Sequence, residues 1–215
     1  MERTTIKDVY ISYAPSDGGN SIGAALYTTY CIRGQERVIS DGSSFIGPDY
    51  QENEIIEVLK RRKLTYRELV QPEQAVAELI SNGQIVAHFF GRMEFGERAL
   101  GNRSILADPR DPDVKRRVNE IIKYREAYRP FAPAVKADQA HKYFAVQSGY
   151  ECRYMEKVVP VRPEFREHLP GVTHVDGSGR LQTVHKNENR RFFQILEEVE
   201  KRTGVKFSPK RDVVI

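Results

Sequence analysis

The sequence predicts an α/β fold, and an α+β arrangement of the same elements stays open as the alternative. Short apolar runs of strand length alternate with segments that show the apolar period of helices, a pattern typical of layered helix-and-sheet folds. The 215 residues are 40% apolar and 30% charged, which is a globular composition. The 11 tyrosines and 10 phenylalanines argue against disorder.

Several sequence features bear on the compartment and on partner classes. No apolar run approaches the roughly 18 residues of a membrane helix. The first residues, Met1 to Thr5, lack the apolar core of a secretory signal. Cys31 and Cys152 are the only cysteines, so we expect a cytoplasmic chain with two reduced thiols and no membrane partner. The net charge of +4 does not by itself indicate nucleic acid as a partner.

The first 50 residues are predicted to form a strand, a loop and a helix, followed by a linker. Asp8–Tyr13 has the composition of a short strand, and Ala14–Gly19 is a turn-rich loop. Asn20 is a candidate N-cap for a helix that continues to about Tyr30. Gly34–Tyr50 is rich in glycine and serine and is predicted to be a linker or long loop.

Helices and strands are predicted to alternate from residue 51 onward. Apolar residues at helical spacing predict a helix over Glu52–Arg62. A second helix begins with Pro72 at its first position and ends before Gly83, its expected C′ residue. Gln84–Phe90 is predicted to be a buried strand, and Ser104–Ala107 a short strand.

A capped helix is predicted to begin at Asp111-Pro112-Asp113, with proline at its first position and acidic residues near its positive end. Its expected buried side consists of Val114, Val118, Ile121 and Ile122. The remaining expected elements are a strand at Phe131–Val135, a helix at Ala137–Phe144, a strand at Tyr154–Val159, a helical turn at Glu164–His168, a hairpin of Thr173–Val175 and Arg180–His185, and a helix at Asn189–Arg202 that ends at Gly204.

Arginines gather in two clusters, each beside residues that shape the backbone. The first is Gly91–Arg110 (GRMEFGERALGNRSILADPR) and the second is Lys123–Pro133 (KYREAYRPFAP). Glycine lets backbone N–H groups approach an anion, and the planar guanidinium suits phosphate or carboxylate. From Gly91 to Arg129, ten Lys and Arg accompany seven Asp and Glu, which suits a small anion better than a nucleic-acid backbone. The alternative is that these arginines are solvated or paired with Glu94, Glu97 and Asp108.

Asp17 precedes a predicted helix and could hold a metal or a nucleotide-bound cation, or could simply form a turn with the glycines after it. His174 and Asp176 lie near the predicted hairpin with Arg180, where ordinary surface polar residues are the alternative. The five histidines show no HxxxH spacing, and no Walker-type phosphate loop is present.

Three runs, Gly91–Arg110, Lys123–Val135 and His174–Val184 (HVDGSGRLQTV), closely resemble the C-terminal domain of the O-carbamoyltransferases of nodulation-factor and antibiotic biosynthesis. Asp8–Tyr27 resembles the end of the preceding N-terminal domain of that family. The resemblance implies that residues 1–50 are the remnant of an actin/Hsp70-type ATPase-like domain plus a linker. It further implies that residues 51–215 form a YrdC-like domain with a twisted mixed sheet, flanking helices and an incomplete C-terminus.

The family resemblance also implies an activity and its substrates. Members use carbamoyl phosphate and ATP to make carbamoyl-adenylate, and then transfer the carbamoyl group to a hydroxyl of a small acceptor. Arg98 and Lys123 are the implied catalytic residues. The implied substrate-binding residues are Arg98, Arg103, Ser104, Lys123, Arg125, Arg129 and Arg180. Asp17 is the implied ligand of a divalent metal, iron or magnesium, whose other ligands belong to an N-terminal region that this sequence lacks.

Departures from the family pattern leave alternatives open. After Thr203-Gly204-Val205 the sequence continues as Lys206–Arg211, where family members have a strand and an Asn-rich motif. We therefore expect a truncated chain or one piece of a split system, with a separate chain that supplies the N-terminal domain. The alternatives are a non-catalytic remnant or partner subunit, and a YrdC-like module that binds RNA.

Overall fold

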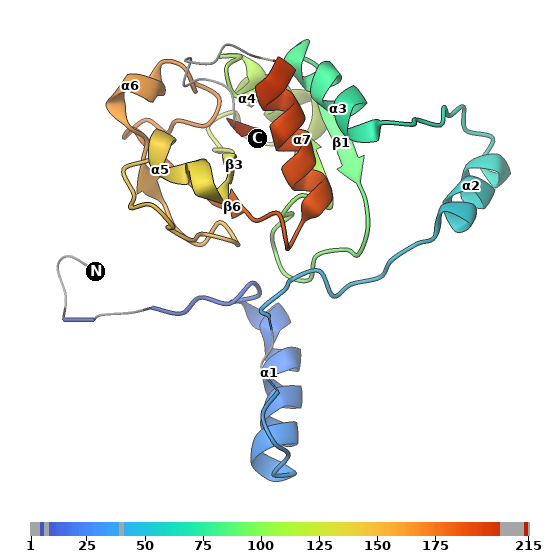
Figure 1. The fold of residues 1–215 in the computed structure, drawn as a ribbon, viewed down its shortest axis with the longest axis vertical. Helices are drawn as coiled ribbons and strands as arrows, with labels where there is room; N and C mark the ends of the chain where they lie inside the picture. The colour runs from blue at the N-terminus through green and yellow to red at the C-terminus, as the bar shows by residue number, and fades with distance from the viewer. Residues whose placement is uncertain (1–4, 7–8, 39–40, 203–212, 215) are drawn as a thin grey trace.

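Helices α3 (Pro72–Ser81) and α7 (Arg190–Arg202) pack against each other on one side of the main body of the computed structural model (Figure 1). The structure describes residues 5–6, 9–38, 41–202 and 213–214. Its other helical elements are η1 (Asp17–Gly19), α1 (Asn20–Tyr27), η2 (Thr28–Ile32), α2 (Glu52–Arg61), α4 (Val114–Arg117), η3 (Val118–Ile122), η4 (Ala137–Gln139), α5 (Ala140–Tyr143) and α6 (Pro163–Arg166). Its strands are β1 (Val86–Phe89), β2 (Arg103–Leu106), β3 (Ala134–Lys136), β4 (Val159–Pro160), β5 (Ser178–Gly179), β6 (Gln182–Val184) and β7 (Val213–Val214).

The strands form three small sheets. Strands β1 and β2 pair antiparallel, with Val86 opposite Leu106 and Phe89 opposite Arg103. Strand β3 is the centre of a mixed sheet, parallel to β6 and antiparallel to β7. Strands β4 and β5 form a separate antiparallel pair. Helices together with small mixed sheets confirm the predicted α/β class at this coarse level.

Two apolar clusters hold the main body together. One lies between α3, α7 and the strands next to them, and its buried residues are Ala77, Ile80, Leu106, Ala134, Val184, Phe192, Ile195, Leu196 and Val199. The other lies under α5, α6 and the β4–β5 pair, and its largest fully buried side chains include Phe144, Val161, Leu169 and Leu181. Burying such aliphatic and aromatic side chains contributes about 1.5–3 kcal/mol each. The two clusters together fix β2, β3 and β6, the strands that border the site described below.

Helices α1 and α2 extend away from the main body (Figure 1). Neither helix buries a residue. Tyr27 and Ile32, at the end of the α1–η2 segment, are 62% and 68% exposed. A helix that is apolar on several sides is normally buried inside a larger structure. No helix among the described residues is both long enough and apolar enough to cross a membrane.

Most predicted helices are confirmed. Helix α2 falls within the predicted range, Pro72 opens α3 at its first position, and Gly83 follows α3 with φ of +76°. The predicted helix after Asn20 continues past Tyr27 as a π-helix to Ile32. Helices α5, α6 and α7 also lie where helices or helical turns were expected, although Gly204 and the Lys206–Arg211 tail lie outside the described residues.

Several predicted strands are wrong or displaced. Described residues 9–13 form no strand, and Asp8 lies outside the described part. Of the strand expected at Tyr154–Val159, only Val159 is in a strand, because residues 153–155 form a turn. The strand expected at Phe131–Val135 begins only at Ala134, whereas Ser104–Ala107 is confirmed within one residue as β2. The strand expected to be buried, β1, has only one covered face, and Phe89 is 55% exposed.

The predicted hairpin around residues 176–179 does not form. Strand β5 pairs instead with β4, and β6 pairs in parallel with β3. Local turn residues are compatible with a hairpin, but all three residues of β6 are buried where the strand pairs with β3. Long-range pairing therefore overrides the local signal.

The helix predicted to start at Asp111-Pro112-Asp113 also differs in its buried side. Asp113 is the N-cap of α4, so Pro112 precedes the helix. Val114 and Val118 are buried as expected, whereas Ile121 is 62% exposed. Residues from Val118 onward form a π-helix, whose wider turn rotates later side chains away from the expected face.

Candidate functional site

A pocket of about 210 Å³ opens beside β2, β3 and β6. Five of the sequence-predicted site residues line it, and they come from distant parts of the chain: Arg98, Ser104, Lys123, Arg125 and Arg180. Apolar side chains form much of the remaining wall, including those of Ile105, Leu106, Phe131, Met155 and Phe192. We call this site the cationic pocket, defined by these ten residues.

Arg98 is carried by a loop that the buried carboxylate of Glu94 organises. Glu94, only 4% exposed, accepts hydrogen bonds from the backbone N–H groups of Leu100 at 2.7 Å and Asn102 at 2.9 Å. Its second oxygen accepts a 3.0 Å hydrogen bond from Nε of Arg103. Burial opposes ionisation of Glu94, but these donors outweigh it and lower the pKa of the carboxyl. The ionised carboxylate thus fixes the backbone on both sides of the glycine turn.

Polar side chains from the C-terminal part anchor the same loop. The Gln182 amide donates to the carbonyl of Leu100 at 3.0 Å. The Asn189 amide donates to Oδ1 of Asn102 at 2.8 Å. Gly101 has φ of +120°, and a Cβ there would lie 2.4 Å from the Phe192 ring. Glycine is therefore required at this close approach between the loop and α7.

The cations of the pocket lack carboxylate partners. Neither the Arg98 guanidinium nor the Lys123 ammonium makes a hydrogen bond or ion pair with another described residue, although the backbone N–H of Lys123 donates to the carbonyl oxygen of Val118. Arg125 donates to Oδ1 of Asn119 at 2.7 Å, and its guanidinium lies 5.0 Å from the Phe131 ring centroid. These neutral contacts orient the guanidinium without neutralising it.

Arg180 completes the set of cations. Its Nε donates to the carbonyl oxygen of Met155 at 3.1 Å, and its Nη2 lies 3.8 Å from the Met155 sulfur. Glu97, which contributes to the pocket rim, is an exposed carboxylate and accepts a hydrogen bond from Ser16 of the N-terminal segment. The pocket therefore holds an excess of positive charge.

The electrostatics of the pocket favour a bound anion. Removal from water lowers the pKa of the Lys123 ammonium, and the nearby charge of Arg125 lowers it further. Desolvation also lowers the pKa of the Arg180 guanidinium, and the charge of Arg98 acts in the same direction. Like charges held close together at a partly dry site are stabilised when an anion binds between them.

Three sequence-predicted site residues lie elsewhere. Arg103 points back to Glu94, to which its guanidinium donates through both Nε and Nη2. Arg129 is paired on the surface with Glu126 at 2.7 Å. Asp17 opens η1 in the N-terminal segment and does not line the cationic pocket, although its neighbour Ser16 bonds to Glu97 at the pocket rim. Their predicted roles as ligands of phosphate or metal remain predictions.

No group of three or more His, Cys, Asp and Glu side chains in the described part of the chain converges on a possible metal position. A metal at Asp17 would therefore need ligands from outside these residues. The residues present do not by themselves fit the divalent metal that the resemblance implied, and we derive no step through it.

Sequence reasoning missed residues that position the pocket. Glu94 had been considered only as a possible ion-pair partner of arginine, and its hydrogen bonds to backbone N–H groups have no sequence signature. Met155 lies in a segment predicted to be a strand, yet it adopts φ of +57° beside Arg180. Asn119 and Phe131 hold Arg125, although Phe131 was predicted only as the first residue of a strand.

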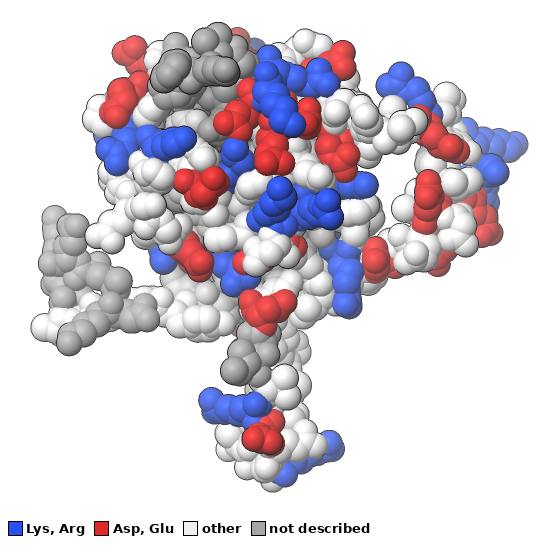
Figure 2. Space-filling view, viewed as in Figure 1, with Lys and Arg blue, Asp and Glu red and all other residues white. Residues whose placement is uncertain are grey.

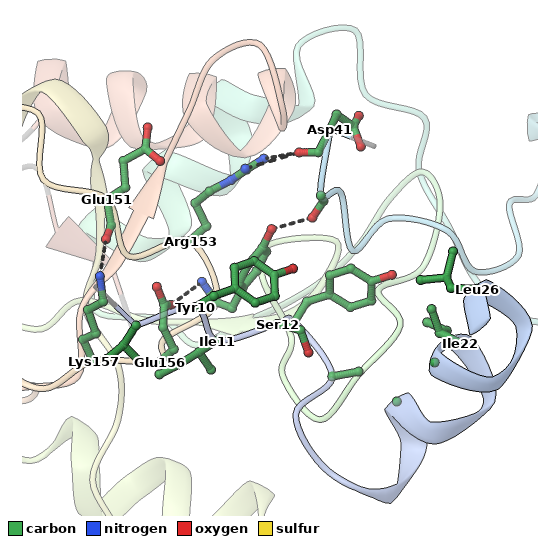
Figure 3. Close-up of a pocket in the computed structure, with 17 residues that line it drawn as sticks. Tyr10, Ile11, Ser12, Ile22, Leu26, Asp41, Glu151, Arg153, Glu156 and Lys157 are labelled. Carbon is green, nitrogen blue, oxygen red and sulfur yellow. Dashed lines mark hydrogen bonds between the residues drawn. The ribbon is translucent and has the colours of Figure 1, made fainter. Parts of the chain in front are cut away.

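A second, larger hollow of about 640 Å³ lies between the N-terminal segment and residues 151–157 (Figure 3). Residues 9–14 and the side chains of Ile22 and Leu26 form one wall, and Arg153, Glu156 and Lys157 are on the other (Figure 3). None of the sequence-predicted site residues lines this hollow. It borders the same stretch of chain that carries Met155 to the cationic pocket.

Residues 77–208 match the family model of the carbamoyltransferase C-terminus. The chain is 38% identical over 206 residues to nodulation protein NolNO of Sinorhizobium fredii, covering 93% of this chain and 30% of that protein. It is 35% identical over 211 residues to an uncharacterized protein of Methanocaldococcus jannaschii, covering 95% of this chain and 34% of that protein.

A further relative, nodulation protein NolO of Bradyrhizobium diazoefficiens, is 34% identical over 205 residues, covering 92% of this chain and 37% of the relative. The chain thus spans about a third of the length of the curated relatives that it matches. The matches cover more of the chain than the C-terminal family model does, so part of the N-terminal 76 residues also aligns with these relatives.

Proposed function

The chain belongs to the carbamoyltransferase family, and from this membership we propose that it binds carbamoyl phosphate and ATP at the cationic pocket to form carbamoyl-adenylate. The carbamoyl group would then pass to a hydroxyl of a small acceptor. One observation carries the proposal: four cations, Arg98, Lys123, Arg125 and Arg180, face one pocket without a carboxylate partner.

The size and walls of the pocket support a small anion as the occupant. A volume of about 210 Å³ accommodates a molecule of the size of carbamoyl phosphate. On the face shown in Figure 2, Lys and Arg are interspersed with Asp and Glu, without a broad field of one sign. A nucleic-acid site would instead need an extended row of cations along the surface. The four cations named above are therefore grouped at one pocket and do not belong to a broad basic field on the face that Figure 2 shows.

The chemistry requires such a concentration of positive charge. Water cleaves the P–O bond of carbamoyl phosphate, which gives carbamate and inorganic phosphate. A carbamate oxygen then attacks the α-phosphorus of ATP, and the bond to the leaving pyrophosphate breaks. Negative charge develops on phosphate oxygens in both steps, and preorganised cations stabilise it. The side chains of Arg98 and Lys123 form no hydrogen bond or ion pair with a described residue, so both are free to serve this role.

Ser104 and Arg125 would orient the bound anion rather than neutralise its full charge. The Ser104 hydroxyl already accepts a 2.9 Å hydrogen bond from the Gly101 N–H, so its own proton is available to a ligand oxygen. Arg125 is held by Asn119 and by the face of Phe131. These contacts fix the direction of its remaining N–H donors.

We also propose that the N-terminal segment docks on a further protein unit, like the part of the relatives that lies outside the matched third. Helix α1 and the residues after it expose apolar side chains on several sides, as at Tyr27 and Ile32. Within the described residues nothing covers them. A YrdC-like part from residue 51 and an ATPase-like remnant before it are consistent with this arrangement, and the partner would supply the acceptor site.

The proposal is tested by calorimetry with carbamoyl phosphate, with and without ATP, on the purified chain. We expect saturable binding that Arg98→Ala weakens by about tenfold or more, because hydrogen bonds to charged groups are among the strong ones. Arg116→Ala is the matched control, since Arg116 is an exposed arginine of α4 paired with Glu120 outside the pocket. Equal affinity in wild type and Arg98→Ala would exclude the assigned role of Arg98. A folded wild type that binds neither ligand would favour a non-catalytic partner subunit.

A further inference from the structure

Residues 151–157, which we call the 151–157 loop, separate the cationic pocket from the larger hollow. On the pocket side, the loop holds Arg180 through the carbonyl oxygen of Met155 at 3.1 Å and more loosely through the Met155 sulfur at 3.8 Å. No carboxylate in the described part of the chain pairs with this guanidinium. The direction in which Arg180 points is therefore set by the backbone of Met155.

Met155 itself adopts a backbone conformation that residues with side chains avoid. Its φ is +57°, a left-handed conformation that is energetically costly for a residue with a Cβ and persists only where its surroundings hold it. The chain before it is firmly anchored at the buried Cys152, whose N–H donates to Oγ1 of Thr183 at 2.9 Å and whose carbonyl accepts from the Thr183 N–H at 2.8 Å. Its thiol also donates to the carbonyl of Leu181 at 3.0 Å. The anchor lies on β6 and on the residue just before it, beside the pocket.

The chain next to Met155 is held from the opposite face. The Tyr154 hydroxyl donates to the carbonyl oxygen of Gly42, and its N–H donates to the Glu156 carboxylate at 2.8 Å. Arg153 donates from both Nη atoms to the carbonyl oxygen of Asp41 at 3.3 Å, as Figure 3 shows. The linker after the N-terminal helix thus accepts hydrogen bonds from Arg153 and Tyr154, the two residues before Met155.

The N-terminal segment adds a second contact at the same residue. The rings of Tyr13 and Tyr154 meet edge to face, with centroids 5.9 Å apart. Such an edge-to-face pair is stabilising beyond the burial of the two rings. Tyr154 therefore connects residue 13 and the linker on one side with the strained Met155 on the other.

We propose that Tyr154 is a positioning residue that holds Met155 in its strained conformation and thereby aims Arg180 at the bound anion. The inference rests on the anion binding proposed above. When the Tyr154 hydroxyl no longer donates its hydrogen bond to the carbonyl oxygen of Gly42, Met155 relaxes toward negative φ. Its carbonyl oxygen then turns away from Arg180. The guanidinium then samples several directions, and the anion loses one preorganised partner. Contacts made by the N-terminal segment and linker in this way set the anion affinity of a pocket that they do not line.

The test compares Tyr154→Phe with the wild type, using inorganic phosphate as the probe in calorimetry. We expect a three- to tenfold higher Kd in Tyr154→Phe, within the range of about 0.5–1.5 kcal/mol for one net hydrogen bond. Tyr150→Phe is the matched control, because the Tyr150 hydroxyl makes no hydrogen bond with a described residue. Its Kd is expected to equal that of the wild type.

A double-mutant cycle separates positioning from a general loss of structure. Arg180→Lys keeps the positive charge, so phosphate still binds, but it lacks the guanidinium that Met155 holds. In that background Tyr154→Phe is expected to change Kd by less than a factor of about two. Full additivity in the cycle, or an unchanged Kd in the single variant, would overturn the inference while leaving the proposed function intact. A wild-type chain that binds no phosphate would instead overturn the proposed function, and the inference with it.

Discussion

Replacing Glu94 by glutamine tests whether one buried carboxylate builds the loop that carries Arg98. The carboxylate accepts two short hydrogen bonds from backbone N–H groups, at 2.7 Å and 2.9 Å, and one from Arg103 Nε at 3.0 Å. Glutamine keeps one acceptor oxygen but turns an NH₂ group toward the donors of Arg103 and removes the negative charge. At about 1.5–3 kcal/mol per charge-assisted hydrogen bond, the expected loss is about 3 kcal/mol. For a domain of this size that corresponds to a Tm about 6–12 °C lower.

The same substitution has a defined pH dependence. The folded-state pKa of Glu94 lies below its ordinary value of 4.5, since the loop N–H donors and Arg103 outweigh the opposing effect of burial. A group with a depressed folded-state pKa contributes stability that is present above its unfolded pKa and is lost as the pH falls through the folded pKa. The Tm gap between wild type and Glu94→Gln should therefore be full at pH 7 and should narrow steadily below about pH 4.5.

Thermal unfolding followed by circular dichroism at pH 7 and in steps down to about pH 3 measures both effects. Glu164→Gln is the control, because Glu164 is an exposed residue of α6 without an ion pair among the described residues. All other carboxylates titrate alike in the three proteins. The difference in Tm between wild type and Glu94→Gln at each pH therefore measures the contribution of the Glu94 carboxylate. A Glu94→Gln variant within about 1 °C of the wild type at pH 7 would refute the assigned role of the carboxylate.

Two other variants and one labelling experiment test the packing. Gly101→Ala should lower the free energy of unfolding in urea by about 3 kcal/mol, because its Cβ would meet the Phe192 ring at 2.4 Å and its φ is +120°. Gly23→Ala, which meets nothing within 4 Å, should be neutral or slightly stabilising, and equal effects of the two would contradict this reasoning. A thiol reagent followed by mass spectrometry should label the exposed Cys31 quickly. Cys152, whose burial raises its pKa to about 12, should react only on unfolding, and fast labelling of both would show that the main body opens readily.

Helices were predicted from the sequence more successfully than strands, for a physical reason. A helix satisfies its hydrogen bonds within one segment, so Pro72 and Gly83 were enough to bound α3. A strand depends on a partner that the local sequence does not contain. Residues 154–158 have the composition of a strand, yet none of them is in a strand. The chain turns at residues 153–155, where the Tyr154 N–H donates to the Glu156 carboxylate and the Tyr154 hydroxyl donates to Gly42 of the linker. The hairpin predicted around residues 176–179 is wrong for the same reason, because β5 and β6 pair with strands that are distant in the sequence.

Arg98 and Arg103 show a limit of inference from the sequence, because tertiary packing determines which of the two guanidinium groups lines the pocket. Both belong to the Gly91–Arg110 run, Arg98 in its loop and Arg103 at the start of β2, and the resemblance implied that both bind substrate. Arg103 is bound to Glu94, which is buried because Asn189 and Gln182 hold the loop from positions 87 and 82 residues away. Arg98 has no such partner and lines the pocket. The residue types therefore predicted that cations gather here. Which guanidinium is bound by Glu94 and which lines the pocket depends on the packing of α7 and β6 against the loop, which the sequence does not show.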